Sequence, residues 1–245
     1  MPGYIRLTLR FSDDPDAAIE QILLRELGNA ERPRVLDAGC GSLCHVRFPG
    51  EPFVVGIDIS PEQLEKNTDV DEKILGDVET HPLEPNSYDA VVCWDTVEHL
   101  NRPERAIANF AQALKPSGLL IIATTNPYSL KGLLTKFTPH SFHVWVYRRL
   151  FGDANAGKPG FAPFPTTLRR SIAPGAMRRL AAEHGLEAAF LAVIRGGQLE
   201  TLSRKKPALG ALYKGVAVLL KVLSLGAYDG TYTDTRAVFK KRGDR

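Results

Sequence analysis

The sequence contains little cysteine, methionine or tryptophan, and the cysteine content excludes one class of protein. Its 245 residues include 3 Cys, 2 Met and 2 Trp. The cysteines are odd in number, and Cys40 and Cys44 stand in or beside a glycine turn. We therefore expect free thiols in a reducing compartment and no disulfide framework. Cys40, Cys44 and His45 lack the fourth ligand of a zinc site, so no metal site is expected.

A signal-peptide-like N-terminal segment and a one-sided composition are missing as well. Residues 1–6 contain no apolar core of signal-peptide length, and we therefore expect a cytoplasmic protein. With 44% hydrophobic and 24% charged residues, the composition is neither that of a disordered chain nor that of a fibrous one. We expect a single domain over residues 1–245, long enough to bury a substantial core.

Charge is almost balanced over the whole chain, which carries a net charge of +3, but it is unevenly distributed. Residues 1–124 hold 11 Lys or Arg against 21 Asp or Glu, a balance of −10, whereas residues 125–245 hold 20 against 7, a balance of +13. This asymmetry suggests that the second half meets something anionic, such as a phosphate-bearing substrate, a lipid surface or nucleic acid. Solvated helix faces would explain the basic residues equally well.

Residues 34–42 organise the chain, because they indicate a buried strand that runs into a glycine turn. Gly39 and Gly41 can adopt backbone angles closed to other residues and let the main chain approach a ligand. Asp37 is an acceptor at the end of the strand. Asp58 ends the next strand, 21 positions later, where an acidic residue can bind both hydroxyls of a ribose.

Apolar runs and helical spacing alternate along the chain. They predict strands over residues 34–38, 53–58, 72–75, 88–94, 119–124, 186–194 and 231–240, and helices over residues 15–28, 61–67, 103–114 and 167–184. Between the first two strands the segment is short and ends at Pro49, so an abbreviated helix is expected there. Alternating strands and helices imply an α/β fold with a parallel, doubly wound sheet and ligands at the carboxyl ends of its strands.

Five segments occur in the order and spacing of a known family. They are residues 35–42, 54–60, 76–78, 88–100 and 114–124. This set resembles the successive motifs of class I S-adenosylmethionine-dependent methyltransferases, most closely the branch that includes the ubiquinone and menaquinone biosynthesis enzymes. The resemblance covers residues 30–126, the expected cofactor-binding core, and implies a Rossmann-like seven-stranded sheet whose last strand is antiparallel. One departure is Leu43, where the family usually has a third glycine.

The resemblance implies a role for each motif in holding S-adenosylmethionine. The backbone of the glycine turn would hold the amino-acid end of the cofactor, Asp37 its amino group, Asp58 the ribose, and Asp77 the adenine amine. The full expected set is Asp37, Gly39, Cys40, Gly41, Asp58, Ile59, Asp77, Val78, Trp94, Asp95 and His99. Ordinary structural roles are open as well: the two strand-end acids as caps, Asp77 as a turn former, and His99 as a packing or capping residue.

Residues 127–165 leave the sheet at its ligand-binding edge and are too long for a simple connection, which is typical of a lid or a binding insertion. His140, His143 and Tyr147 recur at three and four residues there, so on a helix they would share one face. One of the histidines could take a proton from an accepting hydroxyl, because a histidine can be neutral and basic in the cell. A helix cap and a packed imidazole are the structural alternatives. Residues 157–165, rich in proline and glycine, are expected to cross the pocket mouth.

A second insertion, residues 195–230, separates the last two expected strands. Residues 208–226 hold only Lys214 and Lys221 as charges, and their nineteen-residue length approaches a membrane span. Because the chain must return to the sheet, we expect an amphipathic helix over residues 207–226. It could lie on the inner membrane face, form an apolar wall for the substrate, or pack on a second subunit in a homodimer.

These observations predict methyl transfer from S-adenosylmethionine to an oxygen of a small-molecule or lipid-like acceptor. Methylation of RNA or protein is an alternative, although no nucleic-acid-binding module is visible and only residues 169–179 and 204–206 support it. A cofactor-binding module without catalytic activity is the third possibility.

Overall fold

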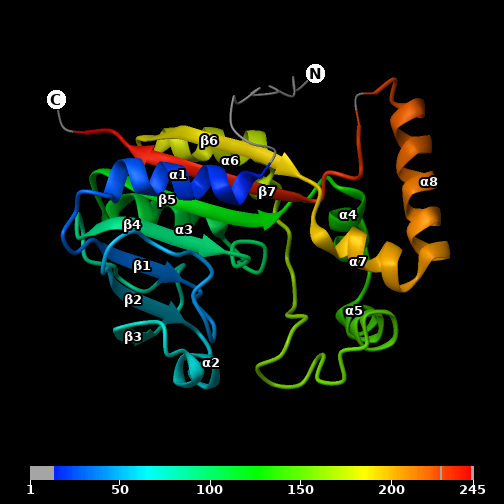
Figure 1. Ribbon diagram of the computed structural model, residues 1–245, viewed down its shortest axis with the longest axis horizontal. Coiled ribbons are helices and arrows are strands. Elements are labelled where there is room, and N and C mark those ends of the chain that lie inside the picture. The colour runs from blue at the N-terminus through cyan, green and yellow to red at the C-terminus, as the bar shows by residue number, and fades with distance from the viewer. Residues whose placement is uncertain (1–13, 227, 244–245) are drawn as a thin grey trace.

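The computed structural model describes residues 14–226 and 228–243. A seven-stranded sheet with the order β3-β2-β1-β4-β5-β7-β6 forms its centre (Figure 1). The strands are β1 (Arg34–Ala38), β2 (Phe53–Asp58), β3 (Glu72–Leu75), β4 (Tyr88–Trp94), β5 (Leu114–Thr125), β6 (Leu186–Ile194) and β7 (Asp234–Lys241). The helices are α1 (Pro15–Leu27), α2 (Pro61–Lys66), α3 (Pro103–Ala113), α4 (Leu130–Phe137), α5 (His140–Val146), α6 (Pro174–Glu183), α7 (Gly197–Lys205) and α8 (Pro207–Leu223). A π-helical turn, Tyr147–Phe151, continues α5, and a 3₁₀ turn, Arg170–Ile172, precedes α6.

The direction of the strands confirms the predicted doubly wound sheet. β1 pairs in parallel with β2 and β4, β2 with β3, and β4 with β5. β7 runs antiparallel to both of its neighbours, β5 and β6. The carboxyl ends of β1, β2, β4 and β5 therefore meet at one edge of the sheet, where the expected site residues gather.

Two apolar clusters cover the two faces of the sheet. Leu36 and Val91 belong to the cluster that includes α3 and α6, whereas Val35 and Val92 belong to the cluster that includes α1. Side chains alternate between faces along a strand, and a strand buried on both faces is apolar throughout. This is why β1 and β4 have almost continuous apolar sequences.

No helix forms between β1 and β2 in the described chain, contrary to the expected abbreviated one. Gly39 and Gly41 both have positive φ, and Pro49 and Pro52 follow within the same segment, so helical backbone has little room to begin. Val46 and Phe48 pack partly over the apolar face in its place. A hollow of about 430 Å³ is left beside them, lined by Val35, Asp37, Cys44, Val46, Arg47, Phe48, Pro52, Val54, Asp69 and Val92.

The helix expected over residues 167–184 is shorter than predicted, because α6 begins at Pro174. The proline disfavours helical backbone in the residue before it, and Ala173 is extended, with ψ 143°. β7 also begins later than expected, at Asp234, because an Asp229 turn precedes it: Asp229 Oδ1 accepts the backbone N–H of Thr231 at 3.1 Å.

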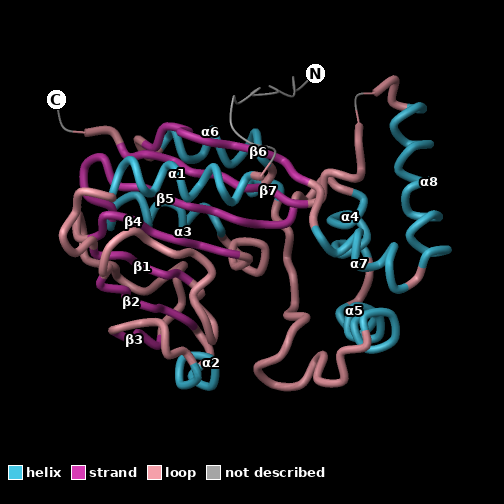
Figure 2. Tube along the Cα trace, viewed as in Figure 1, coloured by secondary structure: helices cyan, strands magenta, loops and turns pink. Residues whose placement is uncertain are grey.

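The two insertions pack against each other and form a helical lobe, defined here as residues 130–151 and 197–223. Figure 2 shows this lobe beside the carboxyl edge of the sheet. The backbone N–H of Lys131 donates to Tyr213 Oη at 3.2 Å, and Gln198 Nε2 donates to Tyr147 Oη at 3.1 Å. These bonds join segments that lie 82 and 51 residues apart, so neither insertion forms the lobe alone.

Candidate functional site

The turn after β1 requires glycine for two separate reasons. Gly39 has φ 76°, and a Cβ there would lie 2.3 Å from Thr96 Cγ2. Gly41 has φ 53°, but a Cβ there would meet only Gln63 Oε1, at 3.7 Å. The first glycine is therefore needed for close packing, whereas the second is favoured by its backbone conformation and borders open space.

Asp58 ties this turn to the end of β2. Its Oδ2 accepts the backbone N–H of Gly41 at 2.9 Å, and its Oδ1 accepts the backbone N–H of Ser60 at 2.8 Å. Each carboxylate oxygen can accept more than one hydrogen bond. Asp58 is half-buried, so its remaining acceptor positions are available to a pair of hydroxyl groups.

Asp37 is buried, with only 5% of its surface exposed. Burial raises the pKa of its carboxyl from 3.8 to about 6; a hydrogen bond with Cys44 opposes the shift, and the charges of Asp58 and Asp69 add to it. A buried carboxyl with a raised pKa is stabilised by a cation, because the cation favours its charged form. The site is thus electrostatically suited to an ammonium group.

The three cysteines are free thiols, as predicted. Burial raises the pKa of Cys40 to about 12, with Asp37 and Asp58 adding to the shift, and it raises the pKa of Cys44 as well. Neither thiol is a nucleophile at neutral pH, since the thiolate is the reactive form. Cys40 lies under the turn and Cys44 lines the hollow.

Asn67 supports the turn through its side chain, and no role was predicted for it. Its side chain is fully buried, and Nδ2 donates to the carbonyls of Cys40 at 3.3 Å and Gly41 at 3.2 Å. The sequence feature that could have indicated this role is an asparagine at the end of α2, because an asparagine at such a position commonly bonds to nearby backbone. Its role here is to fix the carbonyls, so that the turn keeps one conformation.

The expected adenine side of the site consists of Ile59, Asp77 and Val78. Ile59 has 72% of its surface exposed and Val78 only 5%. Asp77 Oδ1 accepts the backbone N–H of Glu79 at 2.8 Å, as a turn former does, and its second oxygen remains available. Asn109 Nδ2 donates to the carbonyl of Val78 at 3.2 Å and holds this segment to α3. An exposed apolar side chain near an acidic acceptor is suited to a purine ring.

Trp94 and Asp95, at the carboxyl end of β4, form the opposite wall. The guanidinium of Arg236 lies 4.5 Å from the centre of the Trp94 ring, and the ring of His45 stacks on Trp94 at 6.1 Å. Trp94, Ala123 and Arg236 occupy one row across β4, β5 and β7, which explains the contact with a residue from the far end of the chain. Asp95 has φ 48°, an uncommon conformation for a residue other than glycine.

Glu98 is a buried carboxylate at the same edge, and no function was predicted for it. Its Oε2 accepts the hydroxyl of Thr124 at 2.8 Å, and its backbone carbonyl accepts the N–H groups of Thr167 and Leu168. Burial raises the pKa of Glu98, and Asp95 adds to the shift. The feature of the sequence that could have indicated this residue is a carboxyl directly after the apolar Val97. Glu98 connects β5 to the chain that leads into α6.

His99 binds the loop that was expected to cross the pocket mouth. Its Nδ1 lies 2.7 Å from the carbonyl of Pro165, and its ring meets Phe164 edge to face at 6.2 Å. We call residues 157–165 the strap. His99 therefore holds one end of the strap to the sheet edge, which favours a structural role for its Nδ1.

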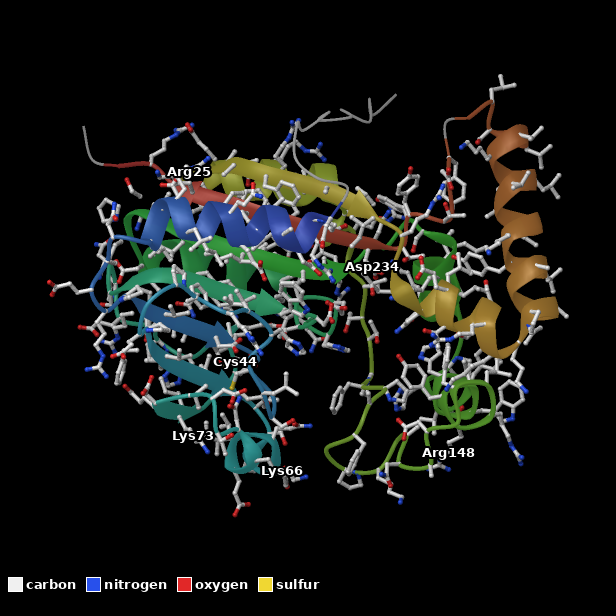
Figure 3. The ribbon with its side chains drawn as sticks, viewed as in Figure 1. Arg25, Cys44, Lys66, Lys73, Arg148 and Asp234 are labelled. Atoms are coloured by element: carbon white, nitrogen blue, oxygen red, sulfur yellow. The ribbon has the colours of Figure 1, made fainter. Side chains whose placement is uncertain are left out.

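The other end of the strap reaches the cofactor half of the fold. Gln63 Nε2 donates to the carbonyl of Gly160 at 2.8 Å, and the ammonium of Lys66 lies 5.4 Å from the centre of the Phe161 ring. In Figure 3 the segment that follows Arg148 runs from the helical lobe toward α2, where Lys66 is labelled, before it turns up to the sheet. The strap thus contacts both α2 and the segment that follows β4.

His140, His143 and Tyr147 lie in the helical lobe, on α5 and the turn that follows it (Figure 1). His143 Nε2 lies 2.8 Å from Thr138 Oγ1, and the rings of His140 and His143 meet edge to face at 6.2 Å. Burial lowers the pKa of His143, and the neighbouring His140 lowers it further. His140 Nδ1 is buried without a hydrogen-bond partner.

A half-buried ion pair joins the helical lobe to the sheet. Lys131 Nζ lies 2.9 Å from Asp234 Oδ1, and Thr233 Oγ1 donates to Asp234 Oδ2 at 2.9 Å. Figure 3 labels Asp234 between the sheet and the lobe. The histidines therefore stand on a separate element from the glycine turn, and the ion pair sets how the two elements face each other. Among the described residues, no group of three or more His, Cys, Asp or Glu is arranged to hold a metal ion.

The residues of the sheet edge would hold S-adenosylmethionine group by group. Asp58 would serve the ribose, Asp37 the amino group, and the exposed Ile59 the adenine, near Asp77. A family model described as a methyltransferase domain matches residues 36–122. This part of the chain is therefore similar to that family. This confirms the resemblance carried by the motifs, all of which lie in or next to that range.

Relatives and solved structures agree on this domain. The ubiquinone biosynthesis O-methyltransferase of Neisseria meningitidis is 30% identical over 132 residues, which cover 46% of this chain and 56% of that protein. The chain spans about half the length of the curated relatives it matches. Phosphoethanolamine N-methyltransferase 2 of Haemonchus contortus, solved with S-adenosyl-L-methionine, is 19% identical, with a TM-score of 0.56 over 92% of this chain and 52% of that one.

The methyltransferase fold also occurs with a different reaction. The crystal structure of the [4+2]-cyclase SpnF has a TM-score of 0.54 and 14% identity to this chain, and covers 93% of this chain and 81% of that one. Similarity at this level establishes the fold alone. The reaction must be argued from the site.

Proposed function

We propose that this chain binds S-adenosylmethionine and transfers its methyl group to an oxygen of a small or lipid-like acceptor. The observation that carries the proposal is the placement of two carboxyl groups, Asp37 and Asp58, beside one glycine turn at the ends of adjacent parallel strands. The match of residues 36–122 to a methyltransferase domain supports it. The bound cofactor supplies a sulfonium methyl group, which needs no further activation to be transferred.

The residues of the chain align the reactants. Asp58 takes the ribose hydroxyls and Asp37 the ammonium group, so the two carboxylates fix the ribose and the amino-acid end of the cofactor. Trp94, whose ring contacts Arg236 and His45, would line the methionine side. Alignment of an acceptor with a bound methyl donor replaces a bimolecular encounter and supplies much of the acceleration that a methyltransferase needs.

The strap excludes water from this arrangement. It bonds to α2 through Gln63 and to the sheet edge through His99, so it crosses from one side of the cofactor site to the other. An enclosed site strengthens the attraction between the Asp37 carboxylate and the cofactor ammonium, since screening by water is reduced. Cofactor binding in turn draws the proton from Asp37, whose pKa is raised in the free protein.

A base assists when the acceptor is an alcohol or a phenol. His143 is the proposed base, with His140 and Tyr147 beside it on the same lobe. The lowered pKa of His143 keeps its ring neutral at pH 7, as a proton acceptor must be. Its bond with Thr138 holds the ring in one orientation.

Two observations favour a lipid-like acceptor. The Neisseria meningitidis relative is named for ubiquinone biosynthesis, and aromatic side chains are exposed on the lobe and the strap. These are Phe137, Phe142, Trp145, Phe161 and Phe164. Such side chains contact apolar ring systems well. Methylation of RNA or protein finds support only in the basic residues 169–179 and 204–206.

Calorimetric titration with S-adenosylmethionine tests the first part of the proposal. We expect binding by the wild-type protein and a clear loss in Asp58→Ala. Transfer of labelled methyl groups to a panel of phenols, alcohols, RNA and protein then tests the acceptor class. Absence of binding heat would refute cofactor binding, and labelling of RNA or protein without any labelling of phenols would refute the acceptor assignment.

A further inference from the structure

Helix α8 packs on the rest of the molecule through one narrow stripe. Gly210 and Ala217 are buried, and Tyr213 and Leu220 are half-buried. At 100° per residue these four positions share one side of the helix. A Cβ on Gly210 would lie 2.6 Å from the Cα of Ser203, so α7 and α8 are in close contact along this stripe.

The opposite side of α8 is apolar and exposed. Figure 1 shows the helix at the outer edge of the lobe. The large side chains on this side, with their exposed fractions, are Leu212 63%, Val216 38%, Val218 59%, Leu219 56%, Val222 65% and Leu223 71%. Lys214 and Lys221 each stand four residues after a buried position and therefore border the buried stripe. No charged residue interrupts the outward side of this described helix, and such a surface is typical of an interaction site.

The charge around this face identifies its partner. Residues 197–226 contain five basic residues, Arg204, Lys205, Lys206, Lys214 and Lys221, against one acidic residue, Glu200. Lys221 forms an ion pair with Asp229 at 2.9 Å, so the other four supply most of the positive charge. A second copy of the chain would bring the same positive charges against them, which is unfavourable. An anionic surface complements them.

We propose that α8 lies in the plane of an anionic phospholipid membrane, with its apolar side among the acyl chains and the neighbouring basic residues against the headgroups. Its 17 residues correspond to about 25 Å of helix, less than the ~30 Å of a hydrocarbon core. Among the described helices, none has the length and apolar content needed to cross a membrane. An in-plane helix agrees with both observations.

Membrane docking at α8 places the helical lobe between a bilayer and the cofactor site. The lobe also carries the exposed Phe137 and Trp145 and the proposed base. An acceptor dissolved in the bilayer would therefore leave the membrane at a point close to the lobe. The docking inference does not depend on the methyl-transfer reaction, and its test has a separate readout.

Co-sedimentation with vesicles tests the inference. We expect the full chain to sediment about tenfold more with vesicles that contain phosphatidylglycerol than with pure phosphatidylcholine vesicles, and salt to weaken this binding. The double variant Leu212→Glu, Leu219→Glu should lose it. The matched control is Leu24→Glu, at a leucine on α1 with 59% of its surface exposed, which should sediment as the wild type does.

Calorimetry with S-adenosylmethionine and circular dichroism on each variant separate loss of docking from loss of folding. Equal sedimentation with both vesicle types, or unchanged sedimentation of the double variant, would overturn the inference. Light scattering provides a further check. A wild-type dimer that the double variant dissociates, without vesicle binding, would assign the apolar side of α8 to a second copy and likewise overturn it.

Discussion

The backbone N–H of Gly41 donates to Asp58 Oδ2 over 2.9 Å, so the carboxylate proposed to bind the ribose also shapes the turn after β1. The second oxygen of Asp58 accepts the N–H of Ser60, at the start of α2. The acid that ends β2 thus joins three segments of the cofactor site, and its loss should affect both geometry and binding.

Asp58→Ala should weaken S-adenosylmethionine binding by about tenfold or more, because hydrogen bonds to a charged acceptor contribute about 1.5–3 kcal/mol. Asp71→Ala is the matched control, since Asp71 Oδ2 accepts the backbone N–H of Val54 at 2.7 Å at the other end of the same strand. It should lower stability and leave affinity intact. Calorimetric dissociation constants decide between these outcomes, and equal affinities for wild type and Asp58→Ala would disprove the ribose assignment.

Asp37 should make both stability and cofactor affinity depend on pH. Its folded pKa of about 6 lies above the ordinary value of 3.8, so the folded state binds the proton more tightly than the unfolded state does. Stability should therefore fall as pH rises from about 4 to about 6, by about 2–3 kcal/mol in total. Asp37→Asn should remove this dependence of the unfolding free energy on pH, which urea unfolding between about pH 4 and about pH 6 measures.

Affinity for S-adenosylmethionine should change in the opposite direction. The ammonium of the cofactor favours ionised Asp37, so binding should strengthen from pH 5 to pH 7 and release a proton on the acidic side. Titrations in buffers with different ionisation enthalpies measure that proton. An affinity that is independent of pH in the wild type would remove Asp37 from the amino-group site.

Gly39→Ala and Gly41→Ala should separate packing from conformational strain. Both residues have positive φ, which costs a residue with a side chain about 1–2 kcal/mol. Only Gly39→Ala adds a clash, with Thr96, so it should lower the free energy of unfolding by clearly more than Gly41→Ala does. Denaturant unfolding of both variants measures the difference. Equal losses would contradict the described contact between Gly39 and Thr96.

His143→Ala should reduce turnover about 10²-fold if this residue accepts the proton from the acceptor. Affinity for S-adenosylmethionine should stay unchanged, since His143 lies in the lobe and not at the glycine turn. His140→Ala and Tyr147→Phe are the comparison variants. An equal loss in His140→Ala alone would move the base to His140, and full activity in all three would show that the reaction needs no base from α5.

Gln63→Ala should release one end of the strap. Loss of its bond to the Gly160 carbonyl removes about 0.5–1.5 kcal/mol, so S-adenosylmethionine should dissociate about 2- to 10-fold faster. Gln21→Ala, at an exposed glutamine on α1, is the control. Stopped-flow dissociation rates test the prediction, and identical rates in both variants would show that the strap does not retain the cofactor.

Much of the fold could be predicted because the sheet is encoded locally. The apolar runs that become β1, β2 and β4 and the proline-led starts of α2 and α3 are visible without knowledge of distant contacts. The glycine turn and Asp58 were found for the same reason. The prediction of a short helix between β1 and β2 was wrong. Phe48 packs against the sheet there instead, and this packing is a tertiary contact that the local sequence does not reveal.

Other parts of the site depend on contacts between distant segments. Arg236 meets Trp94 only because β7 returns beside β5, and Tyr213 meets Lys131 only because two insertions leave the same sheet edge. Asn67 and Glu98 were missed because their importance comes from burial, which a single sequence does not reveal. The spacing of His140 and His143 correctly placed them on one helix, but it could not say how that helix faces the sheet.

In the strand order β5-β7-β6, β7 joins the edge strand β6 to the rest of the sheet. β6 occupies the edge of the sheet and attaches to it through β7 alone, although 39 residues separate the end of one strand from the start of the other. That intervening chain forms α7 and α8 of the helical lobe before it returns to the sheet as β7. A change in the length or path of this lobe segment is therefore expected to alter how β7 pairs with β5 and how β6 is attached.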